Sequence, residues 1–232
     1  MNMPASVTPP DVRTRLVEAT IRLLATHGPS EVKARSVSKE AGLSTMGVYT
    51  YFGGVPELLQ AVADEGFKRL VTVFERTLTT THPISDLSNM VLACREFARS
   101  NPHLYDLMFG LSIDGRYSPS RGSTALAPEQ SVAFRAIYAV LVNACMRLVD
   151  KQLVPIVDPT LIARQLWSAA HGFIMLELSG HFADVANPPA EILVPMCNNI
   201  AIGMGANTET VAAATAPVIA SLQADNQAQA SI

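Results

Sequence analysis

Two short segments on either side of the sequence AGLS, at residues 41–44, carry the residues best suited to chemistry. In the first, Val32 to Glu40, helical spacing turns Val37 inward and lets Lys33 and Arg35 point outward. In the second, Thr45 to Tyr51, Ser44 is a candidate N-cap and two glycines follow as a stop. Two helices joined by so tight a turn form a helix-turn-helix, in which the first braces against phosphates and the second lies in the major groove of DNA.

The segment that contains the helix-turn-helix carries a net positive charge, as a DNA-binding head needs. The whole chain has a net charge of −3, which argues against nonspecific coating of nucleic acid. Residues 11–52, however, carry six Lys or Arg against four Asp or Glu, and the remainder carries eleven against sixteen. The excess of +2 is small, but it falls on the segment that contains the helix-turn-helix.

Helical periodicity extends over most of the chain and predicts an all-α fold. A first helix runs from Asp11 to His27, and a long helix runs from Pro56 to about Thr79. Further helices are predicted over Ile84–Ser100, Pro102–Gly110, Pro128–Lys151, Pro159–Gly180 and Pro188–Met204.

These elements divide the chain into four parts. We expect a flexible arm at residues 1–10, a three-helix DNA-binding head at 11–55 and a ligand-binding and dimerisation body at 56–205. The Ala-, Thr- and Gln-rich residues 206–232 are expected to form a frayed tail. Within the body, Ser112 to Leu126 is the expected mobile loop.

The run AGLSTMGVYTYF at residues 41–52, with Gly28, Val37 and Leu58-Leu59 around it, resembles the head of the tetracycline-repressor (TetR) family. That head is normally written as a glycine ending helix one, followed by IA..AGVS...LY.YF..K..L. The similarity covers about fifty residues in order. It implies a three-helix head, a long connecting helix, and a variable helical body that binds small molecules and dimerises.

The resemblance assigns roles within the head. Tyr49 and Tyr51 look like the family's phosphate-binding tyrosines, although packing beneath the head is the alternative, and Phe52 is expected to pack. Lys33 and Arg35 would hold phosphates, and the exposed start of the recognition helix would approach base edges. The predicted DNA-binding residues are Lys33, Arg35, Ser44, Thr45, Met46, Gly47, Tyr49, Thr50 and Tyr51.

Two positions depart from the family pattern. Val55 stands where the family usually has a lysine, so a common phosphate contact is missing. Met46-Gly47 replaces a glycine followed by a small hydroxyl residue, which makes the tip of the recognition helix more apolar. A thymine methyl group is a plausible target for such a tip.

The body has a candidate site for a hydrophobic ligand. The segments NPHLYDLMFG and WSAAHGFIMLEL resemble a subgroup of TetR-like regulators with a Trp, His, Gly signature, here Trp167, His171 and Gly172. Apolar, adaptable side chains favour a hydrophobic effector, with a long-chain acyl compound as one candidate, although most of them would also suit an ordinary core. The predicted pocket consists of Phe97, Leu104, Tyr105, Met108, Phe109, Phe134, Tyr138, Met146, Trp167, His171 and Met175.

The resemblance also implies a homodimer. Pro159–Gly180 and Pro188–Met204 would form its four-helix interface, with Ala169, Ala170 and Gly172 permitting close approach. Two linked heads would read half-sites about 34 to 36 Å apart on a near-palindromic operator in double-stranded DNA. Repression that is relieved by a ligand is the family's common behaviour, and activation is the alternative.

Other classes of protein find little support in the sequence. Cys94, Cys145 and Cys197 are too far apart for a zinc or redox motif, and we see no catalytic signature, so we expect no metal, no cofactor and no enzyme activity. The opening residues show no secretory or transit signal, and Asn143 and Arg147 interrupt the longest apolar stretch. We therefore expect a cytoplasmic protein without a membrane partner. A helical scaffolding protein, and less so an enzyme that uses an apolar cavity, are the alternatives.

Overall fold

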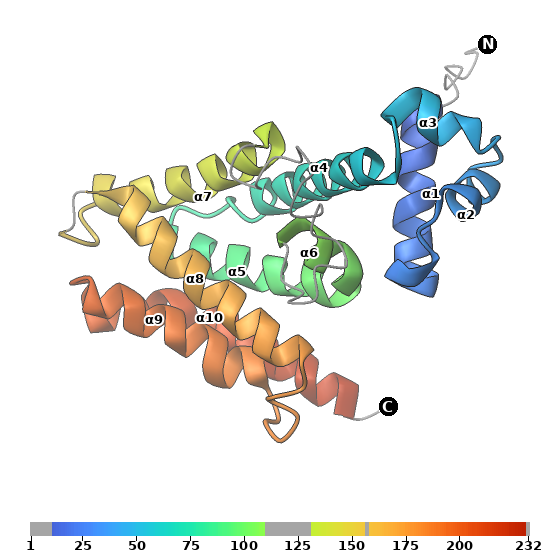
Figure 1. Ribbon diagram of the computed structural model, residues 1–232. Coiled ribbons are helices and arrows are strands. Elements are labelled where there is room, and N and C mark those ends of the chain that lie inside the picture. The colour runs from blue at the N-terminus through green and yellow to red at the C-terminus, as the bar shows by residue number, and fades with distance from the viewer. Residues whose placement is uncertain (1–10, 110–130, 156–157, 231–232) are drawn as a thin grey trace, which may run out of the picture. The chain divides into compact units, whose positions relative to one another are not determined.

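The computed structural model describes residues 11–109, 131–155 and 158–230, and all regular structure within these ranges is helical (Figure 1). The all-α prediction is therefore confirmed. The described residues form two compact units, and the predicted arm at residues 1–10 and the loop at 112–126 lie outside them. The first unit contains residues 11–67, 101–109 and 131–133, and the second contains residues 68–100, 134–155 and 158–230.

The first unit contains the predicted head and two segments from beyond it. Its helices are α1 (Val12–His27), η1 (Pro29–Glu31), α2 (Ala34–Glu40), α3 (Met46–Phe52), the first part of α4 (Val55–Glu75) and α6 (Pro102–Phe109). We had placed α6 with the body, whereas it packs with α1 in the same compact unit as the head. The boundary between the units falls inside α4, after Phe67.

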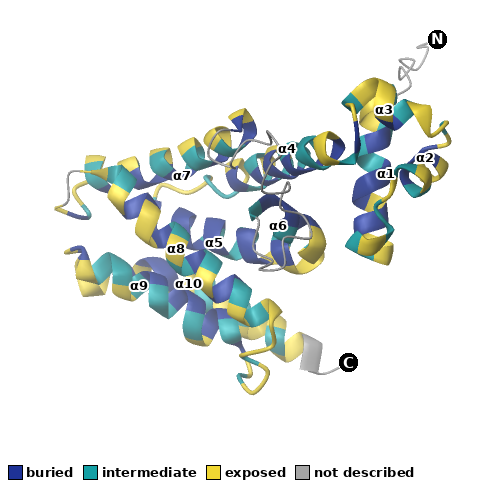
Figure 2. Ribbon diagram, in the orientation of Figure 1, coloured by how far each residue is buried: buried dark blue, intermediate teal, exposed yellow. Residues whose placement is uncertain are grey.

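The helices of the first unit bury their apolar faces against one another. Leu16, Leu24, Val37, Val48 and Leu58 have essentially no exposed surface. Figure 2 shows buried positions along α1. They come from four different helices, so each helix contributes its apolar face to one centre. Asp11 fixes the start of α1 by accepting a hydrogen bond of 2.7 Å from the Thr14 amide, which is the usual way to satisfy a free amide at a helix start.

The second unit is a bundle of long helices. It contains the end of α4, α5 (Pro83–Ser100), most of α7 (Val132–Asp150), α8 (Pro159–Leu178), the π-helical turn η3 (Pro189–Leu193), α9 (Val194–Gly203) and α10 (Thr208–Ala230). α7 has the length and mean hydropathy, 1.6, that a membrane span would need. A single helix of this kind is weak evidence for a membrane span, and 28% of its apolar window is buried in the unit, including Ile137, Leu141, Cys145 and Leu148.

Two ion pairs tie the helices of this unit together. Arg95 of α5 makes a two-pronged contact with Glu177 of α8, at 2.7 to 3.1 Å, and both side chains are largely buried. The fully buried Asp86 accepts hydrogen bonds from Arg147 of α7 at 2.5 Å and from the Thr80 amide at 3.0 Å. Buried carboxylates require such partners because the charge has left water.

The C-terminal segment differs from our expectation of a frayed tail. α10 runs from Thr208 to Ala230 and packs against α5 and α9. Val211, Ala214 and Thr215 are buried, and the Ser85 hydroxyl of α5 donates a 2.7 Å hydrogen bond to the Ala214 carbonyl. A polar, alanine-rich segment carries a weak apolar stripe, so its periodicity did not reveal that part of it would be covered by other helices.

Gly66 on α4 supports a test of the packing in the first unit. A Cβ atom at this position would lie 2.5 Å from the Met108 sulfur and 2.9 Å from its Cγ atom. We predict that Gly66→Ala lowers the free energy of unfolding by about 1 kcal/mol, because overpacking outweighs the gain in helix propensity. Chemical denaturation measures this change in the free energy of unfolding.

Gly203→Ala is the matched control, because nothing lies within 4 Å of its added Cβ atom. That variant should be as stable as the parent or slightly more so. An equal gain in stability at Gly66 would contradict the packing described here.

Candidate DNA interface and effector cavities

The turn between α2 and α3 is short because its backbone is bonded back onto α2. Gly42 has a φ of 64°, and the amides of Gly42 and Leu43 donate to the carbonyls of Lys39 and Ser38 at 3.1 and 2.8 Å. A side chain at Gly42 would be strained in this left-handed conformation. The predicted helix-turn-helix is therefore present in the first unit.

Two arginines of α1 hold the turn and α3 in place. Arg15 donates a 2.7 Å hydrogen bond to the Ala41 carbonyl in the turn. Arg13 donates to the Tyr51 carbonyl near the end of α3, and its guanidinium carbon lies 4.3 Å from the centre of the Phe52 ring. Sequence analysis had counted these arginines only as charge, because their partners are 26 and 38 residues away.

One buried side chain anchors α3, and the large side chains on its outer face are exposed. Val48 is fully buried, whereas Met46, Tyr49 and Tyr51 are 67%, 53% and 41% exposed. The helix begins one residue later than predicted: Thr45 occupies the N-cap position without a side-chain hydrogen bond, so the prediction of Ser44 as the N-cap is wrong. Gly53 ends the helix with a φ of 89°, as predicted.

The predicted DNA-binding residues all lie at the surface of the first unit, except that Gly47 is half-buried. The exposed members are Lys33, Arg35, Ser44, Thr45, Met46, Tyr49, Thr50 and Tyr51. Lys33 has a long contact of 3.4 Å with Glu31, and both side chains are solvated, so this pair holds the lysine weakly.

Most of the predicted pocket residues fall into two separate groups. Leu104, Tyr105, Met108 and Phe109 lie in the first unit, where the Phe109 ring contacts Phe67 and Tyr105 at centroid distances of 5.4 and 4.7 Å. Phe134, Tyr138, Trp167 and His171 meet in the second unit, and we call them the aromatic cluster. Within it, the Trp167 ring lies 5.9 Å from Phe134, 5.9 Å from Tyr138 and 4.3 Å from His171.

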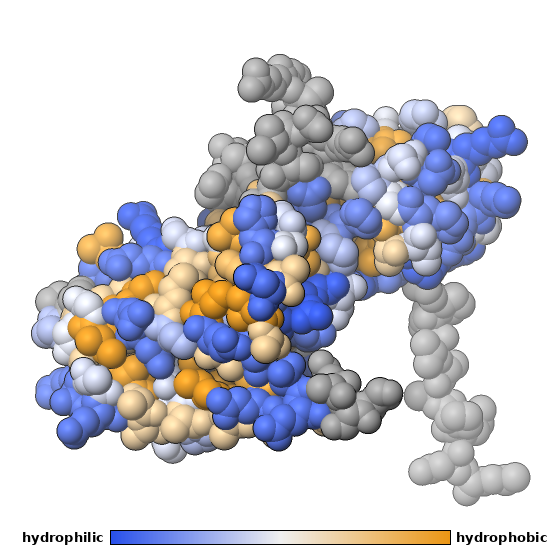
Figure 3. Space-filling model, turned by 90° about the horizontal axis from the view of Figure 1, so that it is seen from below, coloured by the Kyte–Doolittle hydropathy of each residue, from blue (hydrophilic) through white to orange (hydrophobic). Residues whose placement is uncertain are grey.

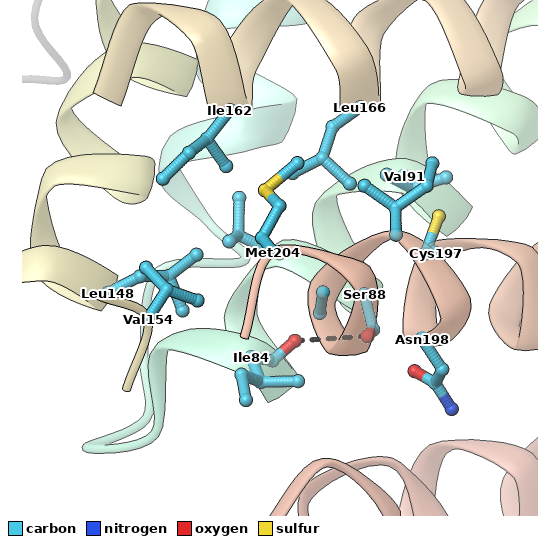
Figure 4. Close-up of a pocket in the computed structure, with 13 residues that line it drawn as sticks. Ile84, Ser88, Val91, Leu148, Val154, Ile162, Leu166, Cys197, Asn198 and Met204 are labelled. Carbon is cyan, nitrogen blue, oxygen red and sulfur yellow. Dashed lines mark hydrogen bonds between the residues drawn. The ribbon is translucent and has the colours of Figure 1, made fainter. Parts of the chain in front are cut away.

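Two small cavities lie in the second unit. The first, of about 30 Å³, lies among α5, α7, α8 and α9 (Figure 4). It is lined by Ile84, Leu87, Ser88, Val91, Leu148, Val154, Ile162, Leu166, Cys197, Asn198, Ile200, Ala201 and Met204. The second, of about 20 Å³, is lined by Phe74, Met90, Val91, Cys94, Leu141, Leu166, Trp167, Ala170 and His171.

Of the predicted pocket residues, only Trp167 and His171 line one of these cavities. Met146 is 43% exposed, so its assignment to a pocket wall is corrected: it lies on the solvated face of α7. Phe97 and Met175 are half-buried and line neither cavity. Residues such as Met90, Val91 and Leu166 were missed because the helical pattern marks them only as buried positions.

Burial controls the ionisation of the polar groups near the cavities. It lowers the pKa of His171 from 6.5 to about 4, so the imidazole is neutral at pH 7. It raises the pKa of both Cys145 and Cys197 to about 12, which leaves these thiols protonated and unreactive. Among the described residues, no cluster of His, Cys, Asp or Glu is suited to hold a metal ion.

The geometry defines a helix-turn-helix DNA-binding protein with a helical body. Residues 16–62 match the family described as bacterial regulatory proteins, tetR family, and residues 87–198 match the tetracyclin repressor-like C-terminal domain. The chain belongs to the TetR family of transcriptional regulators. The Trp, His, Gly subgroup stays a prediction.

Individual relatives are distant. The HTH-type transcriptional regulator Rv1816 of Mycobacterium tuberculosis is 26% identical over 143 residues, which is 60% of this chain, and the chain spans 61% of the length of that relative. A protein of unknown function from Rhodococcus sp. RHA1 has a TM-score of 0.70 at 21% identity, covering 87% of this chain and 99% of that one. RolR in complex with resorcinol has a TM-score of 0.63 at 16% identity, covering 88% and 93%. These two structures share the fold of this chain.

His171, whose Nε2 atom is buried and whose ring is neutral at pH 7, predicts a specific pH dependence of stability. Between pH 6.5 and about 4 the unfolded chain binds a proton at this residue that the folded chain does not, so folding weakens as the pH falls through this window. We expect His171→Gln to remove up to about 3 kcal/mol of that loss. Urea denaturation at several pH values measures the free energy of unfolding of the variant and the parent.

His181→Gln is the control, because His181 is exposed. Its stability should depend on pH as the parent's does. If the two variants had the same pH profile, His171 would not be the buried neutral base described here.

Proposed function

We propose that the protein is an effector-responsive transcriptional regulator that binds double-stranded DNA through α3. The observation that carries this proposal is the exposure of Met46, Tyr49 and Tyr51 on a helix whose position is fixed by Val48, Arg13 and Arg15. Apolar and aromatic side chains that are grouped and exposed on one short helix are typical of a contact surface. A position in the major groove of DNA gives all of them contacts.

The predicted DNA-binding residues then have different roles in binding. Tyr49, Tyr51, Lys33 and Arg35 bind phosphates, which supplies affinity that depends on salt but not on sequence. Thr45, Met46 and Thr50 face base edges, where the Met46 side chain can contact a thymine methyl group. Ser44 and Gly47 bring the backbone of the turn and of the first helical turn close to the DNA.

The outer surfaces of α8 and α9 are the proposed homodimer interface. On α8, Leu161, Leu176 and Leu178 are 47%, 43% and 39% exposed, and nothing lies near the position of a Cβ atom on Gly172. On η3 and α9, Ile192 and Met196 line an open hollow. Figure 3 shows apolar side chains on the face of the second unit that is seen from below.

Within this surface, Gly172 is the residue that allows close approach. Ala170, which we had also expected at the interface, is only 5% exposed and packs inside its own chain. A two-fold arrangement would place the leucines of one subunit against those of the other and remove them from water. Two heads joined in this way would read a near-palindromic operator.

The proposed regulation is a shift between populations of conformers. An effector bound in the body favours a spacing of the heads that does not fit both half-sites, with about 1 to 3 kcal/mol of coupling. α4 contributes to both compact units, so it can transmit the change. The apolar cavities support a hydrophobic effector, repression is the expected mode of action, and the cytoplasm is the expected location.

The proposal is tested by selecting genomic DNA fragments that the purified protein binds. We expect a shared inverted repeat, and Lys33→Ala should weaken binding to all sequences by about tenfold and lower the salt slope by about 1. Lys68→Ala, at an exposed lysine of α4 outside the head, is the control and should bind as the parent does. Binding without sequence preference would indicate a scaffolding protein instead.

The interface is tested with two substitutions at positions of equal exposure. Leu176→Glu on α8 should raise the dimer dissociation constant by at least about 100-fold, because the charge would be buried without a partner. Met146→Glu on α7, also at a position that is 43% exposed, should leave the dimer intact. Analytical ultracentrifugation measures both, and a dimer insensitive to Leu176→Glu would place the interface elsewhere.

A further inference from the structure

The first cavity of the second unit has uncharged walls of aliphatic and sulfur-containing side chains. Figure 4 shows the Met204 side chain extending between Ile162 and Leu166 of α8. Burial raises the pKa of the Cys197 thiol to about 12, and no Lys, Arg, His, Asp or Glu is among the described residues that line this cavity. A charged ligand would lose its hydration here without gaining a counter-charge.

The polar side chains of the first cavity are already engaged with the protein. The Ser88 hydroxyl donates to the Ile84 carbonyl at 3.0 Å. The Asn198 amide donates to the Thr215 hydroxyl at 3.0 Å, and Figure 4 shows this amide directed away from Val91. A ligand hydroxyl or carbonyl group would either break these contacts or stay unpaired, and both cost free energy. A ligand without hydrogen-bonding groups avoids this cost.

The ligand must also be compact, because the volume of the first cavity is about 30 Å³. Val91 of α5 and Leu166 of α8 line both cavities and therefore stand between them. Valine has one strongly preferred rotamer in a helix, so this partition opens only at a cost. An apolar cavity of about 150 Å³ binds benzene, so a ring of that size must move a wall side chain to enter. The unbranched Met204 changes rotamer at little cost and is the wall that yields.

α9 lies between the first cavity and the outer surface of the second unit. Ile200 lines the cavity, and it also lines the open hollow that Ile192, Pro195 and Met196 border. This hollow belongs to the surface that we propose as the homodimer interface. A ligand that widens the cavity therefore presses on a side chain that also reaches the interface.

We propose that the effector is a compact, uncharged molecule without hydrogen-bonding groups that binds in the first cavity, displaces Met204 and changes the packing of the homodimer through Ile200. A small hydrocarbon ring is the simplest ligand of this class. This inference rests on the proposed function, because it names the class of effector and the helix through which the effector acts. Of the ligands expected from the sequence, a hydrophobic effector fits this cavity, and a long-chain acyl compound does not.

Three ligands that share one ring size test the class of effector. The purified protein is titrated by calorimetry at pH 7, without DNA, with toluene, phenol and benzoate. We expect saturable binding of toluene, with a dissociation constant at least about tenfold lower than that of phenol, and no binding of benzoate. Phenol that binds as tightly as toluene, or toluene that does not bind saturably, would overturn the proposal.

Two substitutions with opposite effects test the location of the ligand. Ala201→Phe fills the first cavity and should weaken toluene binding by at least about tenfold, whereas Met204→Ala enlarges it and should tighten binding by about threefold. Ala212→Phe on α10 and Met146→Ala on α7 make the same changes at exposed positions and should bind toluene as the parent does. Thermal unfolding verifies that the variants fold. An unchanged toluene affinity in the folded cavity variants would exclude the first cavity.

The action on the homodimer is measured by analytical ultracentrifugation with and without toluene. Saturating toluene should raise the dimer dissociation constant by at least about fivefold. Ile200→Ala should still bind toluene but lose this response, because the side chain that reaches both the cavity and the hollow is shortened. Ile202→Ala, at a half-buried position of α9 that lines neither, is the control and should respond as the parent does. A dimer that binds toluene without a change in its dissociation constant would overturn the proposed action.

The effector class and the proposed function fail in different experiments. If the protein selects an inverted repeat from genomic DNA but does not bind toluene, the regulator stands and the effector class is wrong. If toluene binds in the first cavity but the protein selects no inverted repeat, the ligand site stands and the proposed function is wrong.

Discussion

The function of this protein depends on holding a seven-residue helix in one orientation. So short a helix is not stable alone in water, because too few hydrogen bonds offset the cost of ordering its backbone. α3 is held by the burial of Val48, by the arginines of α1 at the turn and near its end, and by the left-handed glycines that border it. These contacts use the inner face and the ends of the helix, and they leave the outer face for DNA.

The body combines ion pairs that connect its helices with small apolar cavities between the same helices. The Arg95–Glu177 pair links α5 to α8, and Asp86 links α5 to α7 and to the preceding loop. The cavities lie among the same helices and are lined almost wholly by aliphatic, methionine and aromatic side chains. Directional polar contacts thus fix the helices, whereas the cavity walls are made of groups that repack at low cost.

The aromatic cluster links the packing of α7 and α8 to the ionisation of His171. Trp167 and His171 lie four residues apart on α8, and Phe134 and Tyr138 lie four apart on α7, so each pair projects from one face of its helix. Burial of the imidazole lowers the pKa of His171 to about 4 and keeps the ring neutral at pH 7. This neutrality makes the stability of the folded body sensitive to acid.

Local patterns in the sequence were sufficient for the helices, the helix-turn-helix and the exposed residues of α3, because helical periodicity, capping residues and glycine stops act over a few residues. α8, predicted from Pro159 to Gly180 and found from Pro159 to Leu178, is an example. Only the tertiary structure decided that α6 packs with the head, that α10 is covered by α5 and α9, and which buried side chains border a cavity. These features depend on contacts between residues far apart in the chain, and an apolar residue has the same local pattern whether it faces a void or another side chain.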